Sequence, residues 1–209
     1  LTILAPPGKT IKIPVSCVEA GRWRRESVNL EMSGRHHFAR GRAVRNASVS
    51  HSMRRDGSRR SDQQRVWADI SAKASRMEAP SATQAMAVIF DRHRTSLDNF
   101  VEAFTAGQKQ TGALFAIGSE IVGLDLFDRH TTLAAMLPKL VRSYAIDAIE
   151  TEREEDKSAR KKDAKPFLAK LAMAEIQSYE AVGLGTDLRL LTPGIVGGGL
   201  AVDGALVHL

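Results

Sequence analysis

The sequence is poor in cysteine and aromatic residues, and it has no long apolar run. One cysteine, Cys17, and six scattered histidines occur in 209 residues, of which 5% are aromatic. A lone thiol excludes an internal disulfide, and this cysteine and histidine content excludes a zinc-binding spacing. No stretch of 18 apolar residues and no signal peptide is present. These absences predict a cytoplasmic protein with no membrane segment and no metal site.

Lysine is missing from one strongly basic region. Between Ala20 and Arg60 the chain has eleven arginines, no lysine and three acids, a net charge of +8 in a chain whose total is +6. Guanidinium groups bind phosphate and carboxylate through two parallel hydrogen bonds. Two interpretations are open: a surface for a phosphate-bearing ligand or nucleic acid, and a solvated arginine-rich loop that binds nothing. With only Trp23 and Phe38 as aromatics, base stacking is weakly supported.

Common motifs of catalysis and cofactor binding are also missing. The glycine-rich stretch at 192–200 lacks the lysine and the following helix of a phosphate-binding loop, so it predicts a flexible connection between strands. No Gly-x-Ser-x-Gly elbow occurs. The cofactor, if any, is unknown from the sequence.

Periodicity and turn residues predict an α+β fold with an antiparallel or mixed sheet and about four helices, in a single domain over 1–209. The first residues have a strand pattern without a preceding turn or cap, which predicts a further segment before Leu1. Capping patterns and apolar spacing place helices at 61–77, from 81–84 through Phe104, at 133–149 and at 163–178. Strands are expected at 2–5, 11–18, around the Gly118-Ser119 turn, and from Tyr179 to a hairpin at Asp203-Gly204.

The basic stretch 24–60 predicts an arginine-rich loop region, with a possible strand at 47–53. Low apolar content and like charge lead us to expect that residues 35–60 are weakly ordered without an anionic partner. The mixed-charge run 150–165 predicts a solvated helix end and linker.

The stretch IPVSCVEAGRW, residues 13–23, offers the candidate site. In a strand, Cys17 would share a face with apolar residues and act as a small core residue, the alternative being a nucleophile. Glu19 and Arg22 would follow at the strand end, beside Gly21 and Trp23. They form a polar cluster that faces a ligand, or else a plain ion pair at a strand terminus.

This stretch, with QQRVW at 63–67, VGLDLFD at 122–128, KLVRSYAIDAI at 139–149 and the closing ALVHL, resembles a bacterial domain family. The family is the ADP-ribosylglycohydrolase and rhodanese-phosphatase associated protein domain. The resemblance implies a link to NAD and ADP-ribose metabolism. The positions that match the family are Cys17, Glu19, Gly21, Arg22, Trp23, Gln64 and Trp67. Among these, Trp67 and Cys17 are interpreted as structural.

Three functional hypotheses remain open. In the first, the protein binds or processes an ADP-ribose-like or NAD-like nucleotide. Arg22 with Arg45 or Arg54 would hold phosphates, Trp23 would stack, and Glu19 would act as acid, base or ribose-hydroxyl acceptor, with Gly21 and Gln64 also contacting the ligand. In the second, the arginine-rich segment binds nucleic acid. The third is a structural or partner-binding domain without catalysis. A steep dependence of affinity on salt would favour the second.

Overall fold

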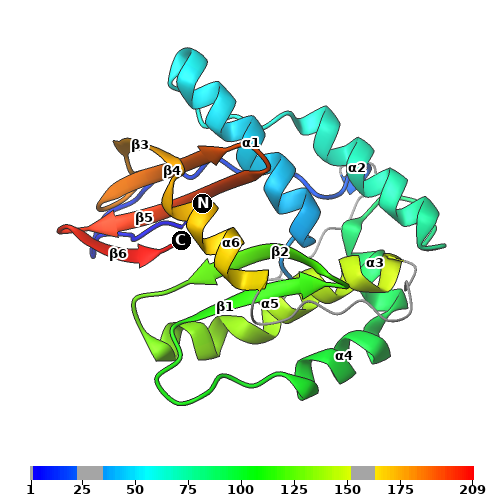
Figure 1. Cartoon of the computed structure of the whole chain (residues 1–209). Helices are drawn as coiled ribbons and strands as arrows, with labels where there is room; N and C mark the ends of the chain where they lie inside the picture. Colours follow the sequence, from blue (N-terminus) through cyan, green and yellow to red (C-terminus); the bar gives the residue numbers. More distant parts are fainter. Residues whose placement is uncertain (1, 23–34, 152–162) are drawn as a thin grey trace. The chain divides into compact units, whose positions relative to one another are not determined.

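The chain folds into two compact units that combine helices and antiparallel sheets (Figure 1), which confirms the α+β class. The computed structural model describes residues 2–22, 35–151 and 163–209. The sheet unit comprises the described parts of 1–14, 106–135 and 153–209, and the helical unit those of 15–105 and 136–152. These residues hold six helices rather than about four, and two sheets rather than one.

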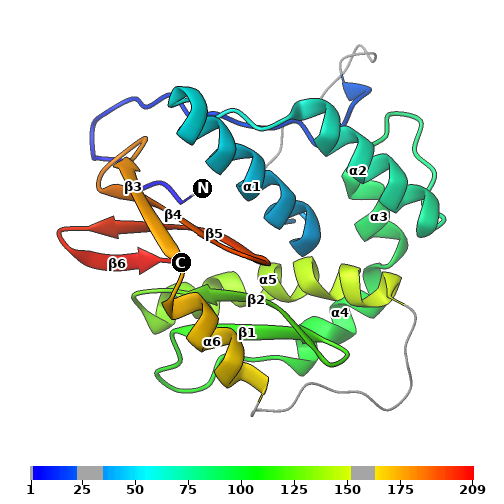
Figure 2. The same cartoon turned by 45° about the horizontal axis from the view of Figure 1, so that its top comes forward.

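The sheet unit contains every strand of the described chain. A hairpin joins β1 (Gly112–Ile117) to β2 (Glu120–Leu126), as the Gly118-Ser119 turn predicts. Helix α6 (Ala164–Ala172) has Asp163 at its N-cap position, as expected, and leads into the second sheet (Figure 2). The helix expected to continue to 178 is wrong beyond Ala172, because residues from 175 onwards pair as a strand of that sheet. That sheet has the order β3-β4-β5-β6, all antiparallel. Its strands are β3 (Glu175–Glu180), β4 (Thr186–Thr192), β5 (Ile195–Val202) and β6 (Ala205–His208).

Local turn chemistry explains the last hairpin. Asp203 and Gly204 have φ angles of 50° and 78°, the left-handed pair that a type I′ turn needs. The flexible connection expected at 192–200 is wrong for most of its length, because Ile195 to Val202 form β5. A turn at Gly194, where φ is 78°, is all that connects β4 to β5.

The helical unit packs its helices around one apolar cluster. Its elements are α1 (Ala39–Asp56), α2 (Gln63–Arg76), α3 (Met86–Arg92), α4 (Arg94–Ala103) and most of α5 (His130–Glu150). Buried side chains from the start of α1 and from α2 to α5 form the core: Phe38, Val66, Ile70, Met77, Ala79, Met86, Ile89, Phe90, Leu97, Ala145 and Ile146. Pro138 lies inside α5.

Helix α1 is the main correction to the sequence-based fold. Residues 39–56 form a helix, so the loop and the strand expected at 47–53 are wrong there, whereas the weak order expected without an anionic partner stays a prediction. The buried side of α1 is formed by small or polar residues, Gly41, Ser50 and Ser52, with Met53 the one large apolar member. An amphipathic pattern is therefore absent, and periodicity could not reveal the helix.

The expected strand at 11–18 is also wrong. These residues form no strand and join no ladder, and the predicted strand at 2–5 contributes one isolated bridge, between Leu4 and Leu184. Pro14 has no N–H to donate to a neighbouring strand, which weakens any pairing there. Ile13 and Val15 are exposed, so the alternating buried face does not exist.

Two helix boundaries differ from the capping patterns. Helix α2 is capped by Asp62, which accepts a hydrogen bond from the Arg65 N–H at 3.1 Å, and not by Ser61. The long helix expected from 81–84 to Phe104 is divided at His93 into α3 and α4. Ser81 instead closes a turn by accepting from the Ala85 N–H at 3.0 Å. Of the linker expected at 150–165, residues 152–162 lie outside the described residues.

Among the residues that the structure describes, we find no helix with both the length and the apolar character needed to cross a membrane.

Candidate anion-binding site in the helical unit

The backbone of the Cys17–Gly21 motif is held by α2 and by the segment before α3. The side-chain amide of Gln63 donates to the Cys17 carbonyl and accepts from the Cys17 N–H, both at 2.8 Å. The Met86 N–H donates to the Val18 carbonyl at 3.0 Å, and the Gly21 N–H donates to the Thr83 carbonyl at 2.8 Å. These hydrogen bonds hold the motif against α2 and the start of α3. One isolated bridge joins Glu19 to Ala85.

Glu19 and Arg22 are paired with each other. Arg22 Nη1 donates to Glu19 Oε2 at 2.9 Å, and both side chains are partly exposed, at 29% for Arg22 and 21% for Glu19. The structure therefore brings these two predicted residues together as an ion pair between positions i and i+3. The Glu19 carboxylate uses one nitrogen of the Arg22 guanidinium and lowers the attraction of this group for a ligand anion.

Cys17 is half-buried rather than fully buried. Its Sγ–H donates to the Glu19 carbonyl at 3.2 Å, so the thiol supports the turn at the motif. The prediction of a core position on a strand face is wrong, because the strand itself is absent.

Other predicted site residues differ in their surroundings. A Cβ atom on Gly21 would lie 2.9 Å from Thr83 Cα, so glycine permits close backbone packing there. Gln64 is exposed, and the contact with the motif is made by its neighbour Gln63. Trp67 is half-buried, and its structural role stays a prediction. Trp23 lies outside the described residues.

Arg45 and Arg54 both lie on α1 but in different environments. Arg54 is exposed in the last turn, whereas Arg45 is half-buried. Burial, and then the neighbouring Arg42, lower the pKa of Arg45. Within the described part of the chain, the Arg45 side chain has no carboxylate partner. The Arg42 guanidinium lies over the Tyr144 ring, 5.1 Å from its centre.

His37 lies close to Arg42 and Arg45. We call these three residues, His37, Arg42 and Arg45, the α1 cationic face. Its ring lies over Gly41, because a Cβ atom there would be 1.9 Å from His37 Cε1. Nδ1 contacts the Phe38 carbonyl at 3.2 Å, while Nε2 is shielded from solvent and has no partner among the described residues. Burial, then Arg45, Arg42 and Lys73, lower the pKa of His37 to about 4, against a hydrogen bond to Phe38 that raises it.

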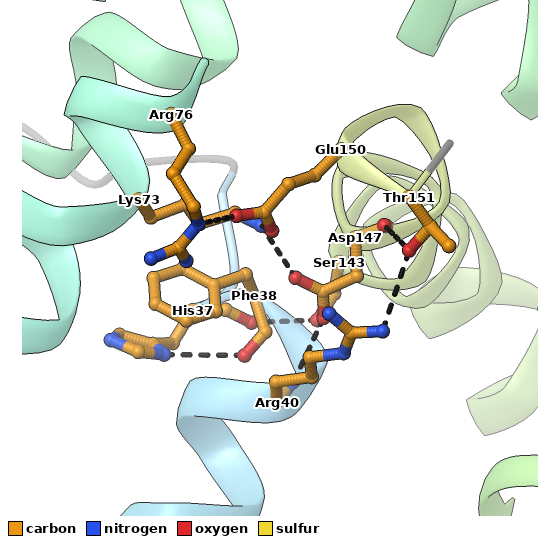
Figure 3. Close-up of polar contacts among 9 residues, drawn as sticks. All are labelled: His37, Phe38, Arg40, Lys73, Arg76, Ser143, Asp147, Glu150 and Thr151. Carbon is orange, nitrogen blue, oxygen red and sulfur yellow. Dashed lines mark hydrogen bonds and ion pairs between the residues drawn. The ribbon is translucent and has the colours of Figure 1, made fainter.

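Beside this face lies a buried ion cluster, the Lys73 cluster: Lys73, Arg76, Asp147 and Glu150 (Figure 3). Lys73 Nζ donates to Asp147 Oδ1 at 2.7 Å and also to Glu150, and only 1% of the Lys73 side chain is exposed. Arg76 Nε donates to Glu150 Oε1 at 2.5 Å. Burial by itself raises the pKa of Glu150, but the hydrogen bonds from Lys73 and Arg76 outweigh it and lower that pKa.

The same cluster holds the first turn of α1. Asp147 Oδ2 accepts from the Arg40 N–H at 2.8 Å, and Ser143 donates its hydroxyl to the His37 carbonyl at 2.6 Å. A carboxylate at a helix N-terminus satisfies an unpaired N–H and meets the positive end of the helix dipole. Two cations and two carboxylates balance in charge, so the Lys73 cluster acts as a structural connection between α1, α2 and α5.

Sequence reasoning missed this cluster, although one signal was present. Lys73 follows Val66 by seven residues and Ile70 by three, which puts a charged side chain on the apolar stripe of α2. Asp147 occupies the same kind of position after Leu140 and Tyr144 on α5. A charge on an apolar stripe must be paired when buried, so each predicts a partner on another element.

Metal chemistry finds no support in the described part of the chain. No group of three or more histidine, cysteine, aspartate or glutamate side chains is placed there to hold an ion.

Comparison with known proteins gives one result. No curated protein and no solved structure matches this chain. A family model matches across residues 1–209. The chain belongs to the family described as the ARG and Rhodanese-Phosphatase-superfamily-associated Protein domain.

Proposed function

We propose that the helical unit binds a phosphate-bearing, nucleotide-like small molecule, of the ADP-ribose or NAD kind, at the α1 cationic face. The observation that carries the proposal is Arg45, a half-buried guanidinium with no carboxylate partner among the described residues. Removing a charge from water without a partner costs free energy, which an anionic ligand would offset. A guanidinium also suits phosphate, because its planar fork matches two phosphate oxygens.

The neighbouring Lys73 cluster sharpens this argument. Lys73 has two carboxylates for one ammonium, so the fold supplies acids where a buried cation needs them. Arg45 lies in the same unit and is paired with no carboxylate among the described residues. Arg42, packed on Tyr144, places a second guanidinium close enough to Arg45 to lower its pKa. Two adjacent guanidinium groups repel each other. A phosphate bound to both would attract each of them and offset that repulsion.

The Glu19–Arg22 pair is a second candidate for phosphate binding within the same proposal. There only Arg22 Nη1 is bound to the Glu19 carboxylate, so a phosphate could bind the other guanidinium N–H groups or replace the carboxylate, and replacement would release Glu19 for an acid, base or ribose-hydroxyl role. Because Arg22 already has a partner and Arg45 does not, we expect the larger share of binding energy at Arg45.

The test compares single variants in calorimetric titrations with ADP-ribose, NAD and pyrophosphate. Arg45→Gln should weaken binding about ten- to a hundred-fold, the usual value of hydrogen bonds to a charged group. Arg45→Lys should weaken it less, because it keeps the charge and loses the fork. Arg65→Gln, at an exposed position on α2, is the matched control and should leave affinity unchanged. Equal affinities of Arg45→Gln and the parent, or no binding of any of the three ligands, would overturn the proposal.

The nucleic-acid alternative rests on the same helix, whose last turn exposes Arg54 and Arg55. Salt separates the two. Affinity for a nucleic acid falls steeply with salt because several phosphates release counterions, whereas a single small ligand gives a shallow slope. Tight, salt-sensitive binding of an oligonucleotide that survives Arg45→Gln and is lost on Arg54→Gln would favour the alternative.

A further inference from the structure

We propose that His37 takes up a proton when an anion binds at Arg45, so that affinity for a phosphate-type anion rises as the pH falls from 7 towards 5. The inference rests on the proposed function and adds its regulation: His37 is the titrating member of the anion site. It is argued from the position of the imidazole ring, its unused nitrogen and the charges around it.

The position of the ring is fixed by the missing side chain of Gly41. The imidazole occupies the space that a Cβ atom there would need, with Cε1 at 1.9 Å from that point. One turn further along α1 is Arg45, and long side chains on a helix point back towards its N-terminus. Arg45 therefore extends towards the ring, which agrees with its being the strongest charge acting on His37.

The ring has one nitrogen in use and one unused. Nδ1 contacts the Phe38 carbonyl, an acceptor, so Nδ1 carries the hydrogen in the neutral ring. Nε2 then keeps a lone pair in a side chain that is 7% exposed, with no donor among the described residues. Figure 3 shows the ring turned away from the carboxylates of Asp147 and Glu150, so neither acid of the Lys73 cluster serves it. Nε2 is the atom that can accept a further proton.

The charges facing His37 explain why the proton is absent without an anion. Arg42 and Arg45 face it from α1, and Lys73 faces it from α2. Asp147 and Glu150 on α5 are bound to Lys73, and Ser143 on α5 contacts only the His37 carbonyl. Burial and these three cations hold the pKa of His37 at about 4. An anion on the two arginines would remove much of their repulsion, and the pKa would rise towards its ordinary value.

Reciprocity gives the direction of the effect on binding. If the anion favours the protonated ring, protonation of the ring favours the anion by the same factor. The gain appears at pH values below the pKa of the complex and above that of the unbound protein. With a pKa near 6 in the complex, affinity should be about tenfold higher at pH 5 than at pH 7.

Sulfate is the first probe, because it keeps its two negative charges throughout this pH range, and ADP-ribose is the second. Calorimetric titration of the full chain at pH 5, 6 and 7, in two buffers of different ionisation enthalpy, gives both the affinity and the number of protons taken up. We expect the parent to bind about tenfold more tightly at pH 5 with net proton uptake. In His37→Gln, affinity should be flat over this range, with no proton uptake. His51→Gln, an exposed histidine on the same helix, should behave as the parent.

The outcomes separate the two proposals. If neither probe binds at any pH, or if Arg45→Gln binds like the parent, the proposed function fails. If Arg45→Gln abolishes binding but the parent shows no proton uptake, or if the pH dependence persists in His37→Gln, only the role of His37 fails. Should His37→Gln not fold, the histidine resonances of the parent decide: the pKa of His37 must rise on addition of sulfate, and a pKa that stays near 4 overturns the inference.

Discussion

The Lys73 cluster and the α1 cationic face both remove positive charge from water within the helical unit, but they do so in opposite ways. Lys73 is 1% exposed and meets two carboxylates, which are themselves buried. Arg45 is half-buried and meets another arginine instead. A buried cation that is paired with carboxylates connects elements of the fold. A cation without a carboxylate partner is a position where an anionic ligand can supply the missing negative charge. Each experiment below either removes this contrast or measures it.

The largest effect is expected from Lys73→Met, which leaves Asp147 buried without its cation and leaves Glu150 paired with Arg76 alone. Breaking a buried pair on one side destabilises a protein by about 3–5 kcal/mol. Urea denaturation should show this loss in the free energy of unfolding. Arg76→Gln is the comparison: Arg76 is 59% exposed, so it should cost about 1 kcal/mol or less. Similar losses in the two variants would mean that the cluster is not a buried one.

A pH titration of stability should give the next largest effect. The pKa of His37 is lowered to about 4 in the folded state, while the unfolded chain has the ordinary value of about 6.5. Between these values the unfolded state binds a proton that the folded state does not, so folding is weakened as the pH falls. Stability is full above about pH 6.5, and about 3 kcal/mol is lost by about pH 4. His37→Gln should remove that part of the slope, and parallel curves for the two proteins would contradict the buried neutral ring.

Gly41→Ala tests how closely the His37 ring is seated. Alanine favours a helix over glycine by about 1 kcal/mol, so an open position would gain stability. Here the added Cβ would overlap the imidazole ring, and a net loss of about 1–3 kcal/mol is expected. Gly107→Ala, outside any helix, controls for the steric term alone, because the nearest atom to its Cβ lies at 3.5 Å and no overlap is expected. A gain in melting temperature for Gly41→Ala would show that the ring is not held against the helix.

The smallest change in stability is expected for Arg45→Met. An unpaired, half-buried guanidinium contributes little to folding, and an apolar chain of similar length keeps its packing, so stability should stay within about 1 kcal/mol of the parent. Thermal melting without ligand measures this. A loss as large as that of Lys73→Met would mean that Arg45 has a structural partner and is not part of a ligand site.

Features that arise from neighbouring residues were predictable from the sequence. The Asp203-Gly204 turn, the Gly118-Ser119 turn and the start of α6 at Asp163 all follow from local chemistry. The Glu19–Arg22 pair was also within reach, because its two residues are three apart. Whether this pair or any other predicted residue binds a ligand stays a prediction.

What could not be predicted depends on residues that are distant in the chain. Lys73 and Asp147 are 74 residues apart, so no local pattern connects them. The strand expected at 11–18 shows the opposite error: alternation suggested a buried face, but Pro14 and the lack of a neighbouring strand leave the segment without a ladder, with Ile13 and Val15 exposed. A pattern can predict a conformation, but the partner decides whether that conformation becomes a strand.

The hydrogen bond from the Arg40 N–H to Asp147 has a consequence for the order in which the chain folds. It joins residues 107 positions apart, so α5 must be synthesised and in place before α1 acquires its N-terminal acceptor. The N-cap residue of α1, Phe38, offers no side-chain acceptor of its own. A polar helix without such support nucleates poorly, because its first turn fixes several backbone dihedral angles and gains one hydrogen bond. Helix α1, with the arginines that it carries, is therefore expected to be a late-forming element, ordered by α5 after the rest of the helical core has condensed.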